Sequence, residues 1–165
     1  MASHSAFESE LTALLPRLRR FAHALSRNPS DADDLAQMAI ERALRSKDQW
    51  QPGTRLDSWL YKITRNLWID TVRSRSRKDK VEAPQEEADR LGHDPRQAVE
   101  ATVDLHRLMA AMERLPDEQR EVVALILIEG HGYREAAEML DLPIGTVSSR
   151  LVRGRTALLA MFGES

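Results

Sequence analysis

Three arginines near the end of the chain have the spacing and the surroundings that phosphate binding requires. Arg150, Arg153 and Arg155 fall close together, and no acidic residue lies between Pro143 and Ala160. Guanidinium groups bind the nucleic-acid backbone because they neutralise phosphate charge and release counterions. An arginine can also form two hydrogen bonds with a guanine in the major groove. These residues therefore indicate a nucleic-acid interface.

The element that must position these arginines is a helix that follows a turn. Residues 133–158 (YREAAEMLDLPIGTVSSRLVRGRTAL) predict a short amphipathic helix, a turn carrying Pro143, and a longer basic helix. Small polar residues (Thr146, Ser148 and Ser149) open the longer helix, so its first turns can approach base edges. This layout is that of a helix-turn-helix. An ordinary helical hairpin with a solvated basic face is the alternative.

A second group of residues that suits nucleic acid lies on the third predicted helix. Tyr61, Arg65, Trp68 and Val72 recur at spacings of four, three and four beside that helix's apolar face. Aromatic rings next to arginines can stack on unpaired bases, each stack contributing about 1–3 kcal/mol. An exposed stripe of this kind would capture single-stranded DNA. The alternative is that Trp68 packs against the preceding helix.

The inventory of reactive side chains argues against an enzyme. The five histidines are scattered, and each is expected at the surface or at a helix terminus. The sequence has neither a glycine-rich phosphate loop nor a nucleophile beside a plausible base. It has no cysteine, which excludes disulfides and thiolate metal sites. We therefore expect no catalysis, no cofactor, no bound metal and no small-molecule substrate.

Hydropathy indicates a cytoplasmic helical protein. No apolar run approaches the roughly 20 residues that span a bilayer, and the polar start MASHSAFESE lacks the core of a signal peptide. The aromatic content of 5% is low for a sheet-rich fold, whereas the hydrophobic content of 42% and the charged content of 30% suit a soluble helical one.

Apolar periodicity predicts helices nearly throughout, and hence an all-α fold. The first helix is expected to kink or break at Pro16, and Ser30 is expected to cap a second helix over about residues 31–45. Thr54 would cap the third helix, and two further helices are expected on either side of Pro116. The expected core residues of the second helix are Leu35, Met38, Ala39 and Leu44.

Charge divides the chain into two small helical domains joined by a flexible acidic linker. Residues 1–80 hold 15 basic and 10 acidic residues, whereas residues 101–165 hold 7 and 10. Residues 81–100 are acidic and contain prolines and a glycine, a composition typical of a linker, although a short helix near residues 85–91 is an alternative. The net charge of −2 thus conceals a basic N-terminal domain.

Three stretches, in order along the chain, resemble one family, the extracytoplasmic-function (ECF) sigma factors of bacterial RNA polymerase. DADDLAQMAIERALR resembles the family's polymerase-binding helix, and TRLDSWLYKITRNLWIDTVRSRSR resembles its promoter-melting helix. LPDEQREVVALILIEGHGYREAAEMLDLPIGTVSSRLVRGRTAL resembles its DNA-reading domain. Asp141 departs from the pattern, since many such turns carry glycine there. The resemblance implies that residues 1–80 bind core polymerase and the −10 element, and that residues 101–165 read the −35 element.

The resemblance also implies roles for individual residues. Asp34, Gln37 and Glu41 share one helix face and would contact the clamp helices of the β′ subunit, whereas Asp31 and Asp33 equally suit stabilisation of a helix N-terminus. Melting and −10 recognition would fall to Trp50, Gln51, Tyr61, Arg65, Trp68, Arg73 and Arg75. The −35 contacts would come from Thr146, Ser148, Ser149, Arg150, Arg153 and Arg155.

The partners implied are core RNA polymerase (through the β′ clamp helices and the β subunit), promoter DNA, and an anti-sigma factor that could hold the protein at the inner membrane. One alternative function is a sigma-like decoy that binds an anti-sigma factor without directing transcription. Another is a repressor that uses only the helix-turn-helix, which would leave the first 80 residues unexplained.

Overall fold

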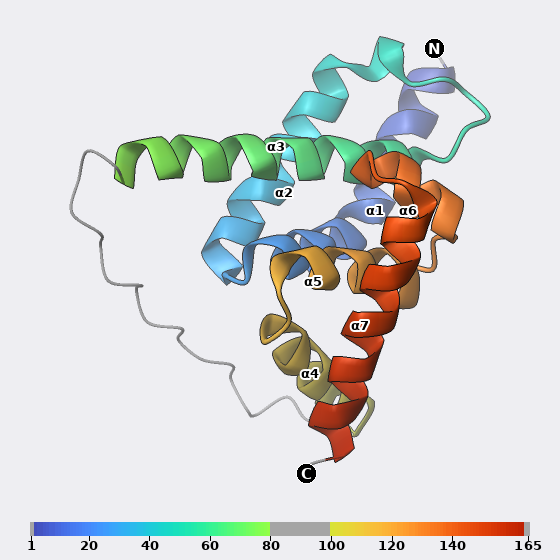
Figure 1. Ribbon diagram of the computed structural model, residues 1–165. Coiled ribbons are helices and arrows are strands. Elements are labelled where there is room, and N and C mark those ends of the chain that lie inside the picture. Colours follow the sequence, from blue (N-terminus) through green and yellow to red (C-terminus); the bar gives the residue numbers. More distant parts are fainter. Residues whose placement is uncertain (1, 80–99, 164–165) are drawn as a thin grey trace.

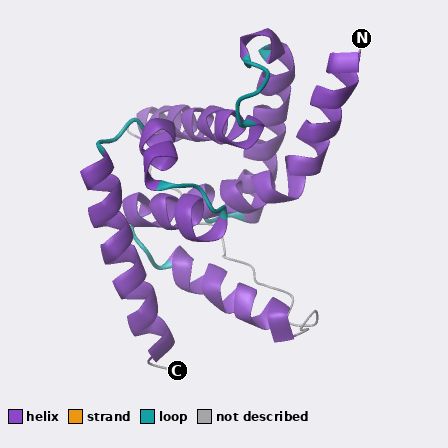
Figure 2. Cartoon of the chain, turned by 90° about the vertical axis from the view of Figure 1, so that its right-hand side faces the viewer, coloured by secondary structure: helices purple, strands orange, loops and turns teal. Residues whose placement is uncertain are grey.

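The computed structural model describes residues 2–79 and 100–163, and every regular element within these two ranges is helical (Figures 1 and 2). The all-α prediction is therefore confirmed. The predicted linker, apart from Glu100, lies outside the described residues, as does the alternative helix near residues 85–91.

The N-terminal group contains three long helices and one short turn: α1 (Ala2–Ser26), α2 (Pro29–Arg45), the 3-10 turn η1 (Lys47–Gln49) and α3 (Leu56–Asp79). Leu18, Phe21, Leu35 and Leu60 are fully or almost fully buried where these helices meet. Pro16 lies inside α1, which continues through it without a break. Of the predicted kink or break at Pro16, the break is therefore wrong.

The start of α2 differs from the prediction. Asn28, not Ser30, is the capping residue, because its side-chain oxygen accepts hydrogen bonds from the backbone N–H groups of Ser30 (2.9 Å) and Asp31 (3.1 Å). Pro29 occupies the first helical turn, where a missing N–H costs nothing. Asn28 satisfies two N–H groups that the helix itself leaves without partners.

Small residues form the buried face of α2. Ala32, Ala36, Ala39 and Ala43 are buried beside Leu35. Met38 and Leu44, which were expected in the core, are 38% and 41% exposed. The alanine face allows the helices to approach closely, so the larger side chains at the flanks of that face turn toward solvent.

The start of α3 also differs from the prediction that Thr54 caps this helix. The Thr54 hydroxyl donates to the carbonyl of Gln51 (2.6 Å), so it closes the preceding turn instead of capping α3. Asp57 does lie in the first turn of α3, as expected, and accepts a hydrogen bond from the N–H of Ser58 (2.8 Å). The helix therefore begins with a carboxylate near its positive end.

The C-terminal group contains α4 (Glu100–Glu113), α5 (Asp117–Val123), the π-helical turn η2 (Ala124–Ile128), α6 (Tyr133–Leu140) and α7 (Ile144–Gly163). Its core includes Met112, Leu115, Val122 and Leu125, together with apolar residues of α6 and α7. Gly130, at a φ of +76°, allows the chain to reverse between η2 and α6.

The two groups pack directly on each other (Figure 1). α1 contacts α4, α5 and η2, and the N-terminal part of α3 lies beside α6. The described residues thus form a closed arrangement in which the C-terminal helices cover part of α1 and α3. This contact decides which of the predicted functional residues are accessible.

Candidate functional site

The predicted helix-turn-helix is present as α6, a turn and α7. Asp141 ends α6 in the left-handed conformation (φ 52°), the backbone geometry for which glycine is usually favoured. Val147, Leu151 and Leu158 face inward from α7. The departure at Asp141 is therefore accommodated without loss of the turn, since aspartate tolerates this conformation better than most residues.

The predicted −35 residues of α7 are unequally accessible. Arg153 and Arg155 are exposed, as is Ser149, whose hydroxyl donates to the carbonyl of Thr146 (3.1 Å). Thr146 and Ser148 are half-buried. Arg150 is also half-buried and lies 3.8 Å from a carboxylate oxygen of Glu118. In this arrangement, Arg153 and Arg155 are the arginines of the set with the freest approach to a phosphate or a base.

The stripe on α3 is not exposed as a whole. Tyr61 is completely buried, which contradicts the expectation of an exposed ring. Arg65 is held by both carboxylate oxygens of Glu121, at 3.0 and 3.3 Å. Val72 is 45% exposed, and Arg73 is exposed. The half of the stripe nearer the start of α3 is therefore covered by the C-terminal helices.

Trp68 is half-buried and packs against the hydrophobic core. The guanidinium of Arg75 lies over its ring, 5.7 Å from the ring centroid. Arg75 is held there by the carboxylate of Asp31 on α2, at 2.8 and 2.9 Å. The alternative in which Trp68 packs toward the preceding helix is thus partly realised, and the ring remains partly exposed.

The loop between α2 and α3 places its two predicted residues differently. Trp50 is half-buried, with its ring 5.5 Å from that of Phe7 on α1, and Phe7 in turn lies 6.2 Å from Trp59. Gln51 is exposed. The aromatic contact anchors the loop to α1, and Gln51 is free to reach a partner.

The predicted polymerase-binding residues share an exposed face of α2. Asp34, Gln37 and Glu41 are all exposed. Beside them, a groove of about 580 Å³ runs between α1 and α2, and Gln37 contributes to its rim. Its apolar walls come from Leu11, Leu15, Ile40 and Leu44.

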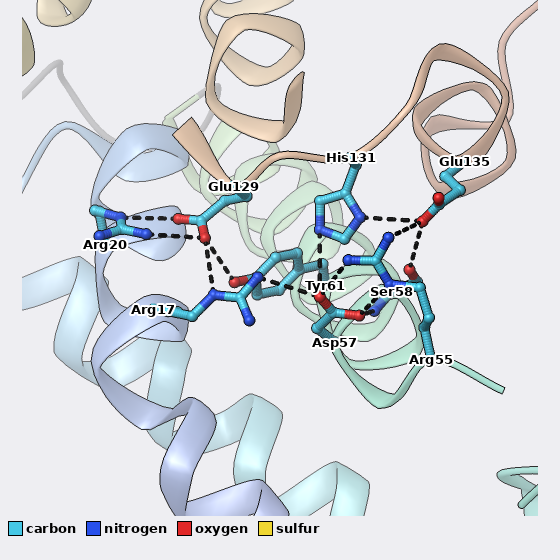
Figure 3. A network of polar contacts seen from close by, with 9 residues as sticks. All are labelled: Arg17, Arg20, Arg55, Asp57, Ser58, Tyr61, Glu129, His131 and Glu135. Carbon is cyan, nitrogen blue, oxygen red and sulfur yellow. Dashed lines mark hydrogen bonds and ion pairs between the residues drawn. The ribbon is translucent and has the colours of Figure 1, made fainter. Parts of the chain in front are cut away.

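A network of charged residues joins the two groups of helices, and its centre is Glu129 (Figure 3). The Glu129 side chain is only 1% exposed. It accepts hydrogen bonds from Arg17 (3.2 Å), from two nitrogens of Arg20 (2.8 and 3.0 Å), and from the hydroxyl of Tyr61 (3.0 Å). A buried carboxylate requires such partners, because an unpaired buried charge is strongly destabilising.

The same network continues through Asp57, Arg55, His131 and Glu135 (Figure 3). Arg55 donates to both oxygens of Asp57 (3.1 and 2.8 Å) and to Glu135 (2.7 Å). His131 lies between the two carboxylates, 3.3 Å from Glu135 and 3.8 Å from Asp57. Its ring meets that of Tyr61 edge-on at 5.4 Å.

These contacts change the protonation equilibria of the buried members. Burial raises the pKa of Tyr61 well above its ordinary value, and the negative charge of Glu129 adds to the increase. Burial alone would also raise the pKa of Asp57, but the hydrogen bonds from Arg55 and the neighbouring His131 and Arg17 outweigh it and lower this pKa. At neutral pH the phenol of Tyr61 is therefore neutral and the carboxylate of Asp57 is ionised.

A second polar anchor lies at the C-terminal end of α1. Arg120 of α5 is 2% exposed, and it donates to the carbonyls of Ala24, Leu25 (3.2 Å) and Leu115 (2.9 Å). Arg27, in the left-handed conformation (φ 61°), donates to the same Leu115 carbonyl (2.6 Å). Carbonyls at the end of a helix lack helical partners and carry partial negative charge, so they stabilise a guanidinium.

The sequence analysis did not identify this boundary. The predicted place of His131 is the surface or a helix terminus; His131 does lie just before α6, but it is 2% exposed. A signal was present: Glu129 and His131 directly follow the apolar run ALILI, where charged residues are expected to be buried only if they are paired. The partners of Glu129 are Arg17, Arg20 and Tyr61, which lie at least 68 positions away in the sequence. The pairing therefore could not be found from local patterns.

Among the described residues, no three histidine, aspartate or glutamate side chains gather as a metal site. No helix in residues 2–79 or 100–163 is long and apolar enough to cross a bilayer.

Comparison with known proteins gives consistent matches along the chain. The family model for sigma-70 region 2 matches residues 11–78, and the model for sigma-70 region 4 matches residues 105–158. The ECF sigma factor EcfG of Rhodopseudomonas palustris is 38% identical over 92% of this chain and 82% of its own length. SigE of Mycolicibacterium smegmatis is 39% identical over 86% of this chain and 56% of its own length.

A solved structure is similar over nearly the whole length. The sigma factor RpoE of Bartonella quintana, crystallised with the anti-sigma factor NepR, superposes with a TM-score of 0.83 at 31% identity. The match covers 96% of this chain and 97% of that one. CnrH, solved with the cytosolic domain of CnrY, shares the fold with a TM-score of 0.68 at 23% identity.

Proposed function

This chain belongs to the sigma-70 family, among its ECF sigma factors, and we propose that it confers promoter specificity on core RNA polymerase. In this proposal, residues 1–80 bind the polymerase and the −10 element, residues 101–165 read the −35 element, and residues 81–100 connect them. Sigma factors are not a catalytic enzyme family, so the work of the chain is binding. The cytoplasm, where polymerase and promoter meet, is its proposed site of action.

The observation that carries the proposal is the pairing of two exposed polar faces on separate helical groups. One is the face of α2 with Asp34, Gln37 and Glu41. The other is on α7, where Arg153 and Arg155 are both exposed and lie on the two sides of that helix's stripe of buried residues. The first provides carboxylates for a basic partner, and the second provides guanidiniums for DNA.

We assign each of these residues a role by the family resemblance. Arg153 and the hydroxyls at the start of α7 would read bases of the −35 element, whereas Arg155 would hold a phosphate. On the N-terminal side, Gln51, Trp68 and Arg73 are accessible in whole or in part. We assign them, with Trp50, Tyr61, Arg65 and Arg75, to the −10 element and to melting.

An anti-sigma factor is the further partner that we propose. The support is the complex of the Bartonella quintana RpoE with NepR, because that sigma factor shares both fold and sequence with this chain. The apolar groove between α1 and α2, next to the proposed polymerase face, offers a surface that such an inhibitor would cover.

Capture of core polymerase on the immobilised chain tests the proposal. We expect the Asp34→Lys/Glu41→Lys double variant to lose polymerase while it retains its helicity, since two carboxylates of one exposed face are reversed. The matched control is Glu10→Lys/Asp70→Lys, which reverses two exposed carboxylates elsewhere in the same domain. Equal capture by the wild type and the α2 variant would remove α2 from the polymerase interface.

A further inference from the structure

The far half of α3 and the start of α2 bring three side chains together. The guanidinium of Arg75 lies over the ring of Trp68, 5.7 Å from the ring centroid, which is within the range of a cation–π interaction. Asp31, in the first turn of α2, holds this guanidinium with both of its carboxylate oxygens, at 2.8 and 2.9 Å. One face of the ring thus lies beneath a charged group whose position depends on a second helix.

The two members of the ion pair differ in freedom. The backbone N–H of Asp31 donates to the capping side chain of Asn28 (3.1 Å), and the Asp31 side chain is 23% exposed. The Arg75 side chain is 53% exposed. The carboxylate is therefore the anchored member, and the arginine is the member that can turn toward an incoming anion.

Arg75 binds Asp31 in the geometry that it would use with DNA. Two parallel N–H···O bonds are the arrangement in which a guanidinium holds either a carboxylate or a phosphate. A phosphate can therefore replace the Asp31 carboxylate on Arg75 oxygen for oxygen. When the arginine follows the phosphate, the ring of Trp68 becomes open to the face of an unpaired base. One nucleotide would provide both the anion and the ring that this exchange needs.

The arrangement lies beyond the contact between the two groups of helices. The ion pairs and hydrogen bonds that join α3 to the C-terminal helices extend from Arg55 to Arg65. Trp68 and Arg75 follow them along α3, toward the end that extends away from α6 and α7 (Figure 1). The exchange can therefore be measured on the free full-length chain.

We propose that Asp31 is a positioning residue for promoter melting: it holds Arg75 over Trp68, and a phosphate of the melted strand displaces it from Arg75 before a base stacks on that face of the ring. The proposal rests on the proposed function, because it takes Trp68 and Arg75 as contacts of the −10 strand. Asp31 itself touches no nucleotide. It weakens the capture of a strand by the strength of one ion pair.

Fluorine NMR of the free chain tests whether Asp31 keeps Arg75 over the ring. The chain has three tryptophans, so fluorotryptophan labelling gives few resonances, and Trp68→Phe assigns that of Trp68. In Asp31→Asn this resonance should shift more between ordinary and heavy water, because the ring is more exposed. Asp33→Asn removes an exposed carboxylate of the same turn and should leave the shift unchanged. Equal shifts in the wild type and in Asp31→Asn would overturn the proposal.

Binding of single-stranded oligo(dT) to the full chain tests the exchange. Stacking on an aromatic ring tolerates any base, so no promoter sequence is needed. Asp31→Asn should bind about two- to five-fold more tightly than the wild type, the range that an exposed ion pair gives. Asp33→Asn loses the same charge and should gain less. An ion pair that only stabilised the fold would give no gain in affinity when it is removed.

The role of the arginine is tested in the Arg75→Gln background. There the Asp31→Asn and Asp33→Asn substitutions should have equal effects on oligo(dT) affinity, because the carboxylate has no guanidinium to hold. Equal effects in the presence of Arg75, or a Trp68 resonance that oligo(dT) does not move, would overturn the proposal. A failure of the proposed function would appear separately, as a wild-type chain that binds oligo(dT) and does not direct transcription.

Discussion

At the scale of single residues, the ring of Trp68 packs within the fold and is also the proposed stacking partner of an unpaired base. Trp68 is partly buried against the hydrophobic core and carries Arg75 over one face of its ring, and Arg75 is held by Asp31. Displacement of the arginine toward a phosphate would free that face of the ring for a base. The contact with Asp31 thus holds Arg75 over the ring in the described structure.

Replacement of Trp68 by alanine should separate melting from binding. We expect Trp68→Ala to lower open-complex formation on a duplex promoter and to matter much less on a template with a pre-melted bubble, because stacking contributes about 1–3 kcal/mol only to the unpaired base. Permanganate footprinting of both templates measures this. Since Trp68 is half-buried, the unfolding temperature is measured alongside. An equal loss on both templates would point to a folding defect or a general loss of affinity.

The two exposed arginines of α7 should behave differently from each other. Arg153→Ala is expected to cost about 1–3 kcal/mol at one −35 base pair and to relax specificity there. Arg155→Ala should weaken binding to all sequences alike and reduce the dependence on salt. Binding titrations against a set of single base-pair substitutions distinguish these outcomes. If both variants gave the same profile, the assigned orientation of α7 on DNA would be wrong.

At the scale of helices, Asp31 links the start of α2 to the far end of α3. The hydrogen bond from Arg75 lowers the pKa of Asp31 in the folded protein, despite an opposing effect of burial. The stabilisation is therefore present above the unfolded pKa of about 3.9 and is lost as the pH falls through the lower folded value.

In the Asp31→Asn variant, the free energy of unfolding should therefore fall less steeply as the pH becomes acidic. Urea unfolding between about pH 5 and pH 2 is expected to show a smaller loss for this variant than for the wild type, whose stability at pH 7 should be the higher of the two. Asp33→Asn changes an exposed carboxylate of the same turn and serves as the control. A variant whose acid limb coincided with that of the wild type would exclude Asp31 as a stabilising carboxylate.

The crossing of α5 and α7 depends on a glycine. A Cβ atom at Gly154 would lie 2.7 Å from Cγ2 of Val123, which is itself 1% exposed. Gly154→Ala should destabilise the protein by about 1–3 kcal/mol through overpacking, less the gain of about 1 kcal/mol in helix propensity. Gly145→Ala, in the same helix with open space around it, should not lower the melting temperature. Similar melting temperatures for the two variants would contradict this packing argument.

How far the sequence predicted these elements depended on how local the causes were. Apolar periodicity and turn residues account for the helix-turn-helix, the capped start of α2 and the long α3. The existence of these elements was therefore predictable, and only their first and last residues differ from the prediction. The capping role of Asn28 was missed because Ser30 fits the same pattern. The burial of Tyr61 and His131 depends on contacts between domains, which no local pattern encodes.

At the scale of the whole molecule, charge is segregated so that one half of the chain can bind the other. The basic N-terminal domain faces an acidic C-terminal one, and the paired residues are drawn from both. Under the proposed function, the same separation places the basic charge in the domain that is assigned to the −10 element. The net charge of the chain gives no sign of this, because the two contributions nearly cancel.

Run-off transcription reconstituted from core polymerase, this chain and linear genomic promoter fragments tests the central claim most directly. The account predicts transcripts that start at discrete promoters, that require the added chain, and that disappear with Asp34→Lys/Glu41→Lys but persist with Glu10→Lys/Asp70→Lys. If the chain bound core polymerase and no fragment gave a chain-dependent transcript, or if the α2 variant transcribed as well as the wild type, the account would be contradicted.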